Sequence, residues 1–586
     1  MTLAALALLA ATAWALGRAA IRSRWSDLRG YERAALILTA GLGLTALLLS
    51  LVALAGAFRY AVGVLACLGT AGLVLAIRDV VRRAPDPPRA TAPRSARVLH
   101  AALLAAALLG CLGAVAPVTD EDALAYVLPI ARHIATDGAL RVWPDQARSM
   151  WPESQQVMLG FMMRLGSDRL GALSAFEWLL ALGAVSALVR RACEREEHHA
   201  AAMVLALGAP VLAFQIASSK EDLFLLAASA AAAASVLGEG GAAELAAAGL
   251  FAGIAAGAKY PGLGVAAAFV AWTALAHRAW RPREVAVVAT TALAAGGLWY
   301  GLNLWRFGNP VAPFVFGAPG TPLTAGLVRA FNEGFGVGYG PAAFLLAPIR
   351  IFTSPWPFAG RSGWFNPLVY AGLAGLFVAS ARRRSGPLFF AAGVVYVGWF
   401  FSLQNARLLL PVAVMLAPSA ADRLVPIVAT RRWLQPAAWI VAALSVGIVG
   451  TVGPVRFERY VRDPATYLER ESAHYADIRW MNAHLDHVRD RVGSEHKVLA
   501  YLEVPALFLD ANYELEIGDA EQDDGPRLLA ACRRQGITYL YGRPDSFAGM
   551  WPHLQLVYEN PASRIGGSTF FREPPTEATA IFRIVE

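Results

Sequence analysis

The sequence predicts an α-helical polytopic membrane protein with a small α/β domain at its C-terminal end. Of its 586 residues, 57% are hydrophobic and 16% are charged, whereas soluble globular proteins carry roughly 25% charged residues. Apolar runs long enough to span a bilayer recur along most of the chain. Beyond residue 454 the composition becomes that of an ordinary soluble protein. These observations exclude a soluble enzyme, a disordered chain, a disulfide scaffold and a collagen.

The apolar runs predict about 12–14 transmembrane helices. The first run lacks a preceding basic segment, which favours a membrane span over the alternative of a cleaved signal peptide. The fourteen runs lie near residues 2–17, 34–55, 60–77, 98–117, 170–190, 200–217, 221–238, 243–258, 261–277, 285–304, 364–380, 387–402, 407–421 and 434–453.

Basic residues concentrate in alternate loops between these runs, which predicts the orientation of the chain. Cytoplasmic loops of membrane proteins are enriched in Lys and Arg, and here the enriched loops lie near 18–33, 78–97, 190–195, 278–283, 382–384 and 423–432. The opposite, outer side then carries two long loops, about 118–169 and 305–363, and the C-terminal tail. The net charge of +8 is explained by loops that face anionic lipid, so no nucleic-acid partner is predicted.

The change in composition predicts two domains, a transmembrane domain over 1–454 and a soluble extracytoplasmic domain over 455–586. The second contains 15 Lys and Arg against 21 Asp and Glu. Its pattern of helices and strands indicates an α/β domain. Helices are predicted at 464–490 and 526–535, and strands at 497–504, 537–541, 554–558 and 579–585.

The first outer loop opens with an acidic cluster, Asp120, Glu121 and Asp122, followed by a helical pattern that contains Tyr126. One carboxylate is enough to cap a helix, whereas a cluster of three also suits cation binding or a general base. Capping and solvation remain the alternative. Later in this loop Glu153 follows a Trp-Pro pair, which indicates either a polar site or a simple interfacial anchor.

Three cations stand out on the outer side. Lys220 and Lys259 are the only lysines in the first 454 residues, and both fall in outer turns, against the positive-inside bias. Such lysines either extend to the interface or bind a phosphate or pyrophosphate group as point charges. Arg407 begins a predicted span, where the helix dipole disfavours a cation, so it requires an anionic partner in the protein or in a ligand.

Motifs for other chemistries are absent from the sequence. It contains no Walker loop, no Gly-x-Ser-x-Gly and no His-Glu-x-x-His. Its four cysteines have no metal-ligand spacing. We therefore expect neither a metal nor a cofactor.

Taken in order, these segments resemble the GT-C superfamily of membrane glycosyltransferases, in particular bacterial relatives of protein mannosyltransferases and of lipid A aminoarabinose transferases. The resemblance covers roughly residues 100–420, and Val127 stands where one version of the family motif has His. The segments are Asp120-Glu121-Asp122, Asp122-Ala-Leu-Ala-Tyr126-Val-Leu-Pro129, Lys220-Glu-Asp222, Gly253-x-x-x-Gly257-x-Lys259-Tyr260, Asn303 with Gly308-Asn309-Pro310, and Gln404-x-x-Arg407-x-x-x-Pro411.

The resemblance implies an enzyme of the plasma or inner membrane that moves a sugar from a polyprenyl-phosphate donor to an acceptor hydroxyl at the outer face. The acceptor is a glycan, a lipid or a protein. Either Asp120 or Asp122 is implied as the base, and Lys220, Lys259 and Arg407 as phosphate partners. The alternatives are a transporter or flippase of lipid-linked glycans and a non-catalytic subunit. The remaining residues implied to bind substrate are Glu121, Tyr126, Glu153, Asp222, Tyr260, Asn309 and Gln404.

Overall fold

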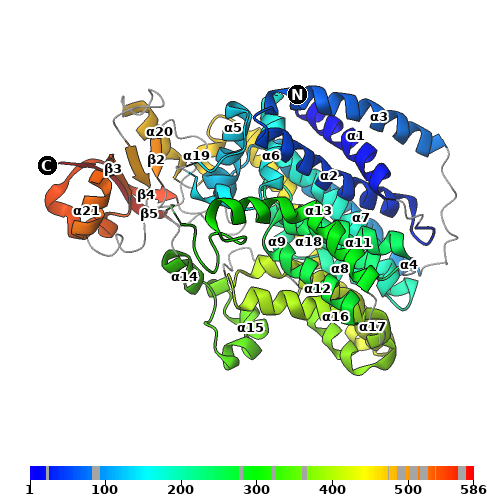
Figure 1. Ribbon diagram of the computed structural model, residues 1–586. Coiled ribbons are helices and arrows are strands. Elements are labelled where there is room, and N and C mark those ends of the chain that lie inside the picture. The colour runs from blue at the N-terminus through cyan, green and yellow to red at the C-terminus, as the bar shows by residue number, and fades with distance from the viewer. Residues whose placement is uncertain are drawn as a thin grey trace.

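The computed structural model consists of a large helical part and a small sheet at one end of it (Figure 1). It describes residues 1–21, 25–81, 93–143, 146–238, 241–275, 282–319, 321, 325–358, 366–472, 474–484, 497–500, 512–514, 525–534, 536–564 and 576–585.

Each of the fourteen predicted apolar runs coincides with helix. The corresponding helices are α1 Thr2–Ala20, α2 Gly30–Leu54, α3 Ala61–Val81, α4 Arg94–Gly110, α7 Gly171–Ala192, α8 His199–Leu207, α9 Pro210–Gln215, α10 Asp222–Val236, α11 Ala242–Ala258, α12 Pro261–Leu275, α13 Pro282–Phe307, the 3-10 helix η7 Pro367–Phe377, α16 Ala379–Phe400, α17 Leu410–Thr430 and α18 Gln435–Arg462.

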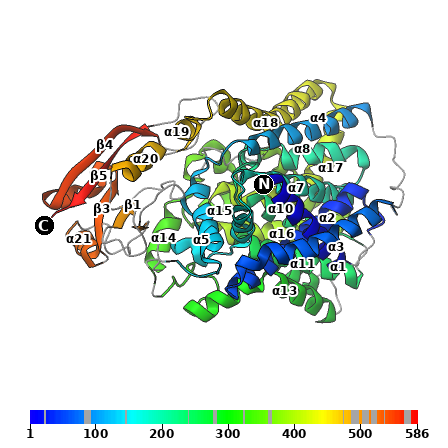
Figure 2. The same ribbon diagram turned by 90° about the horizontal axis from the view of Figure 1, so that it is seen from above.

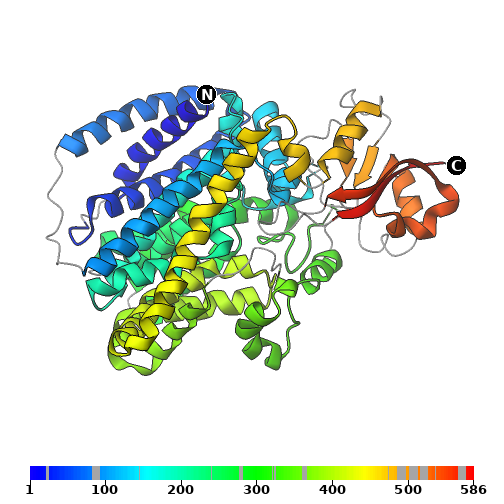
Figure 3. The same ribbon diagram turned by 180° about the vertical axis from the view of Figure 1, so that it is seen from behind.

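Eight helices among the described residues are long and apolar enough to cross a membrane, and six further apolar helices are shorter. The polytopic helical class predicted from the sequence is therefore confirmed. The run at 200–217 forms two helices, α8 and α9, because Pro210 has no backbone N–H to continue the ladder of the first. Helix α18 continues beyond the predicted domain boundary at 454 to Arg462 and runs beside α4 (Figures 2 and 3).

The two long outer loops are themselves largely helical. The first contains a π-helical turn, η3 Ala123–Val127, followed by α5 Leu128–Asp137, η4 Ala147–Met150 and α6 Ser154–Arg164. The second contains α14 Ala325–Glu333, α15 Pro341–Thr353 and η6 Trp356–Phe358. Helix α5 lies at the end of the helical part that is nearer to the sheet (Figure 1).

Close packing between α11 and α13 depends on glycine. A Cβ atom added to Gly253 would lie 2.2 Å from the carbonyl oxygen of Ala292, and one added to Gly296 would lie 2.1 Å from that of Gly253. Small residues of this kind let helix backbones approach within a membrane. The contact fixes the C-terminal end of α11, where Lys259 follows directly.

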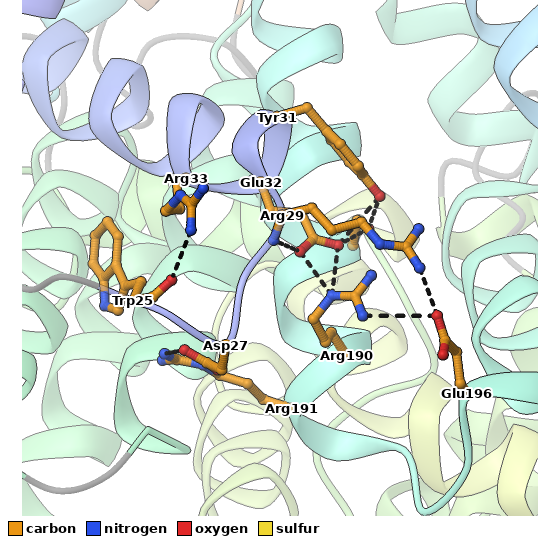
Figure 4. A network of polar contacts seen from close by, with 10 residues as sticks. Trp25, Asp27, Arg29, Tyr31, Glu32, Arg33, Arg190, Arg191 and Glu196 are labelled. Atoms are coloured by element: carbon orange, nitrogen blue, oxygen red, sulfur yellow. Dashed lines mark hydrogen bonds and ion pairs between the residues drawn. The ribbon is translucent and has the colours of Figure 1, made fainter. Parts of the chain in front are cut away.

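An ionic network joins the start of α2 to the end of α7, at the side predicted to be cytoplasmic (Figure 4). The fully buried Glu32 carboxylate accepts hydrogen bonds from Nε of Arg190 at 2.8 Å and Oγ of Ser186 at 2.7 Å. It also accepts one from the backbone N–H of Arg29, whose side chain contacts Glu196 at 2.5 Å. Since every group in it has a protein partner, we interpret this network as structural.

We expect the substitution Glu32→Gln to lower the free energy of unfolding by about 3 kcal/mol, because it removes the carboxylate 2.8 Å from Nε of the largely buried Arg190 and leaves that charge with the longer contact, 3.9 Å, to Glu196. Thermal unfolding of the detergent-solubilised protein measures this effect. The exposed pair of Glu197 with Arg195 provides the control, since Glu197→Gln should change stability by less than about 0.5 kcal/mol. Equal stability of the two variants would contradict a structural role for Glu32.

The C-terminal segment forms a five-stranded sheet of order β2-β1-β3-β5-β4. Parallel pairs join β1 Lys497–Ala500 to β2 Asn512–Glu514 and to β3 Ile537–Gly542. Antiparallel pairs join β5 Thr576–Ile584 to β3 and to β4 Leu554–Arg564. The predicted strands at 537–541, 554–558 and 579–585 are confirmed, β1 confirms the start of that at 497–504, and residues 501–504 lie outside the described residues. Strand β2 was not predicted from the sequence.

Three helices accompany the sheet. Helix α21 Gly525–Arg534 packs Leu528 and Cys532 into an apolar core with Phe582 of β5. Within the predicted helix at 464–490 the structure has two helices, α19 Tyr467–Glu471 and α20 Tyr475–His484, and residues 485–490 lie outside the described residues. Asp477 of α20 is fully buried and bound by five side chains of the sheet, which fixes this helix against β4 and β5; the donors are Tyr541, Tyr558, Asn560, Ser563 and Thr579.

Candidate active site

The acidic motif of the first outer loop separates into two roles. Oδ1 of Asp120 accepts the backbone N–H of Ala123 at 3.1 Å, so this carboxylate caps the following helix as the simpler interpretation predicted. Asp122 makes no such capping bond. A π-helical turn begins directly after it, and such turns occur frequently at functional sites. Glu121, which lies between these two carboxylates, is half-buried.

Two cations from distant parts of the chain converge on these carboxylates. Nζ of Lys220, in the turn before α10, lies 2.8 Å from Oδ2 of Asp120 and 3.4 Å from Oδ2 of Asp122. Nη1 of Arg407, in the 3-10 turn before α17, lies 2.7 Å from the same oxygen of Asp122. The anionic partner that the position of Arg407 requires is therefore Asp122.

A second group of ion pairs adjoins the first through the chain from Lys220 to Asp222. Nζ of Lys259 lies 2.9 Å from Oε1 of Glu221 and 3.1 Å from Oδ1 of Asp222. The other carboxylate oxygens of Glu221 and Asp222 are buried and have no hydrogen-bond partner in the part of the chain that the structure describes. We name the seven residues of both groups the ion-pair cluster: Asp120, Asp122, Lys220, Glu221, Asp222, Lys259 and Arg407.

The cations of the cluster set its protonation state. Burial alone would raise the pKa of Asp122, but the charges of Arg407, Lys220 and Arg148 outweigh burial and hold that pKa below its usual value. Burial opposes the charge of Lys220, yet the carboxylates, Asp120 first among them, raise its pKa above the usual value. Asp122 is thus a carboxylate and Lys220 an ammonium group at neutral pH.

Aromatic side chains line the cluster on the side of the first outer loop. Tyr126 is 3% exposed, and its ring lies edge-on to Trp151 with centroids 5.6 Å apart. The guanidinium of Arg148 lies 4.5 Å from the centroid of the Tyr126 ring and 5.6 Å from that of Trp151. These cation–π contacts hold the Arg148 guanidinium against the two rings.

Glu153 occupies a different environment from the ion-pair cluster. Its side chain is fully buried, and among the described residues neither carboxylate oxygen has a hydrogen-bond partner. Burial raises the pKa of Glu153 well above its usual value, which favours its neutral form. The adjacent Ser154 donates to the carbonyl oxygen of Gly257 at 2.6 Å, which anchors this loop to α11.

The remaining predicted residues hold the backbone around the cluster. The hydroxyl of Tyr260 donates to the carbonyl of Ala312 at 2.5 Å and accepts from Nδ2 of Asn303 at 3.0 Å. The Asn309 amide donates to the carbonyls of Phe314 and Gly317.

The Gln404 side chain bonds the backbone of Val337, Gly338 and Phe400. The amides of Asn309 and Gln404 therefore shape the second outer loop, and a direct role for them in substrate binding stays a prediction.

Sequence reasoning missed three groups near the cluster. Glu221 forms an ion pair with Lys259. Its position between Lys220 and Asp222 in the sequence could have identified it as a member of the site. Arg148 was an arginine on the disfavoured outer side. Glu177 of α7 is fully buried and accepts a hydrogen bond from Gln155 at 3.2 Å, and its only signal was an acid within an apolar span.

The arrangement can perform one kind of chemistry directly. An ionised carboxylate lies within hydrogen-bond distance of two cations, so an anion bound by the cations would be held beside a group that accepts protons. Of the residues predicted for the site, the structure brings together Asp120, Asp122, Lys220, Asp222, Lys259 and Arg407. No group of three or more metal-ligating side chains suited to a metal ion occurs in the part of the chain that the structure describes.

No protein-family description and no curated protein matches the sequence. Among solved structures, ArnT from Cupriavidus metallidurans bound to undecaprenyl phosphate is similar over 82% of this chain and 97% of its own, at 14% identity and a TM-score of 0.46. Its apo state gives 16% identity and a TM-score of 0.47 over the same shares. Arabinofuranosyltransferase AftD from Mycobacteria is similar over 85% of this chain and 40% of its own, at 15% identity and a TM-score of 0.44.

Proposed function

We propose that the protein is a membrane glycosyltransferase that moves a sugar from a polyprenyl-phosphate donor to an acceptor hydroxyl at the outer face of the membrane. The observation that supports this function best is the shared contact of Lys220 and Arg407 with Asp122. A leaving phosphate needs cations, an attacking hydroxyl needs a base, and these groups lie in direct contact.

In the proposed reaction the acceptor oxygen attacks the anomeric carbon of the sugar. The new C–O bond forms as the bond from that carbon to the phosphate oxygen breaks, and the electron pair leaves with polyprenyl phosphate. Lys220 and Arg407 stabilise the charge that develops on the phosphate. The hydroxyl proton passes to the Asp122 carboxylate, which acts as general base.

The ion pairs suggest how the donor prepares the base. Without substrate, both cations lower the pKa of Asp122 and make it a weak base. A bound phosphate shares these cations and so weakens their hold on the carboxylate. The pKa of Asp122 then rises towards its usual value, and the base strengthens only when the donor is in place.

The proposal extends to orientation and domains. We place the ion-pair cluster and the C-terminal sheet on the outer side, because the Arg-rich loops lie at the other ends of the helices. The chain is then a multi-pass protein with a soluble extracytoplasmic domain over 455–586. The carboxylates and cations of the cluster lie in contact rather than dispersed, which disfavours the alternative of a non-catalytic subunit.

Mass spectrometry of lipids that co-purify with the detergent-solubilised protein tests the function. We expect a polyprenyl-phosphate sugar on the wild type and at least a tenfold loss from Lys220→Ala/Arg407→Ala, because both phosphate partners are removed. When donor is added together with a membrane extract that supplies acceptor hydroxyls, the wild type should also release polyprenyl phosphate, and the double variant should not. A large lipid-linked oligosaccharide retained by both proteins, without release, would instead indicate a flippase.

A further inference from the structure

A second charged site lies apart from the ion-pair cluster and shares no residue with it. It is a pocket of about 640 Å³ between the start of α3, the end of α5 and the end of α6, within the roughly 300–1,000 Å³ of small-ligand sites. Three arginines line it, together with two apolar side chains and a threonine hydroxyl. We name it the arginine pocket; its charged members are Arg59, Arg132 and Arg164, and Val62, Met163 and Thr136 complete its side-chain lining.

Backbone contacts fix the walls of the arginine pocket. The N–H of Phe58 donates to the carbonyl of Gly138 at 3.1 Å, and that of Leu140 donates to the carbonyl of Ala53 at 3.0 Å. These bonds join the end of α2 to the loop that follows α5. Nη1 of Arg164 donates to the carbonyl of Ala135 at 2.9 Å, which joins α6 to α5. The pocket is therefore built by three fixed elements rather than by a loose loop.

The charge of the arginine pocket is strongly positive. No acidic side chain lines it, and Arg59 and Arg164 form no ion pair with any residue that the structure describes. Asp137 follows the lining in sequence, and its carboxylate accepts Nε1 of Trp143 at 2.9 Å and the hydroxyl of Thr136 at 3.3 Å. The two guanidinium groups of Arg59 and Arg164 are exposed at the pocket, where they favour the approach of an anion.

The surroundings indicate where the anion comes from. Helix α3 runs along the edge of the helical part beside α1 (Figure 1), and Val74 on it is 62% exposed and Ile77 57% exposed. Tyr60, which is 58% exposed, directly precedes the first residue of α3. Its ring centroid lies 4.8 Å from the Arg59 guanidinium. An exposed apolar helix that starts at an aromatic residue and an arginine is typical of the lipid–water interface.

We propose that the arginine pocket binds the phosphate group of an anionic membrane lipid, with the acyl chains against the exposed face of α3. Guanidinium groups bind phosphate oxygens through paired, charge-assisted hydrogen bonds. The apolar lining residues Val62 and Met163 contact the glycerol end of the head group. This site does not depend on the proposed function, because its residues take no part in the ion-pair cluster.

Lipid binding by native mass spectrometry tests the proposal, with the full chain in nanodiscs of phosphatidylcholine with and without phosphatidylglycerol. We expect retention of phosphatidylglycerol to fall about tenfold in Arg59→Gln/Arg164→Gln, since two interfacial cations are lost. Arg59→Lys/Arg164→Lys keeps the charges and should retain more lipid than the Gln variant. The control Arg329→Gln/Arg350→Gln removes the same charge from exposed arginines of α14 and α15 and should retain lipid normally.

A second arm distinguishes the source of the phosphate. If inorganic phosphate raises the unfolding temperature of the wild type, but not of Arg59→Gln/Arg164→Gln, as much as phosphatidylglycerol does, the pocket is a phosphate site filled from solution. Equal retention of phosphatidylglycerol by the wild type and both arginine-pocket variants would overturn the proposal.

Discussion

Asp122→Asn should lower the rate of sugar transfer by about 10²–10⁴-fold, the usual contribution of a general base. The substitution keeps the size of the side chain and removes its ability to accept a proton. It also removes a negative charge that competes with the donor phosphate for Lys220 and Arg407. Co-purified donor lipid should therefore be retained as well as, or better than, on the wild type. Turnover of isolated donor with a membrane extract as the source of acceptor, measured beside lipid retention, separates the two effects.

Two matched variants show whether the effect belongs to Asp122. Asp168→Asn changes a carboxylate in the same outer loop whose side chain is 72% exposed, and it should leave turnover unchanged. Asp120→Asn retains a capping side chain, because Asn caps helices as well as Asp does. It should lower turnover less than Asp122→Asn does. Loss of turnover in Asp120→Asn with normal turnover in Asp122→Asn would assign the base to Asp120 instead.

Arg407→Gln should lose both donor binding and stability. The Arg407 and Asp122 side chains are 19% and 20% exposed and lie 2.7 Å apart. Breaking a buried ion pair leaves an uncompensated charge, so we expect a loss of about 2–4 kcal/mol in the free energy of unfolding, towards the lower end because of this partial exposure. Thermal unfolding in detergent and mass spectrometry of co-purified lipid measure the two losses.

A double-mutant cycle identifies the cause of the stability loss. The double variant Arg407→Gln/Asp122→Asn removes both charges of the pair, so no unpaired charge remains there. It should recover much of the stability that Arg407→Gln loses. Arg329→Gln removes an arginine that is 80% exposed and forms an ion pair with the nearby Glu333, and it should lower the free energy of unfolding by less than about 1 kcal/mol. Strictly additive losses at Arg407 and Asp122 would show that the two side chains do not interact in the folded protein.

Several features of the fold could be predicted because they depend on local sequence. Apolar runs specify helices wherever they occur, since each span satisfies its own backbone hydrogen bonds. The strands at 537–541 and 554–558 were likewise marked by their own residues. Strand β2 at Asn512–Glu514 could not be predicted from its own residues. Three residues of this composition form a strand only beside a partner such as β1.

Part of the candidate site could also be predicted from the sequence. Lys220, Lys259 and Arg407 were conspicuous because their positions are electrostatically unfavourable without a partner. The amides of Asn309 and Gln404 looked equally suited to a ligand, but the structure shows them bound to backbone groups. A polar side chain in an outer loop has the same sequence pattern in either role, so only its neighbours decide.

By itself, the sequence determined the class of the protein, the sequence positions of its apolar helices and the residues whose charges need an explanation. Only the tertiary structure decided how those charges pair: Asp120 caps a helix, whereas Asp122 lies against Arg407, 285 residues further along the chain. It also brought Arg59 and Arg164 into one pocket. The physical reason is that periodicity and composition act over a few turns of chain, whereas an ion pair depends on which helix ends the packing of the whole molecule brings into contact.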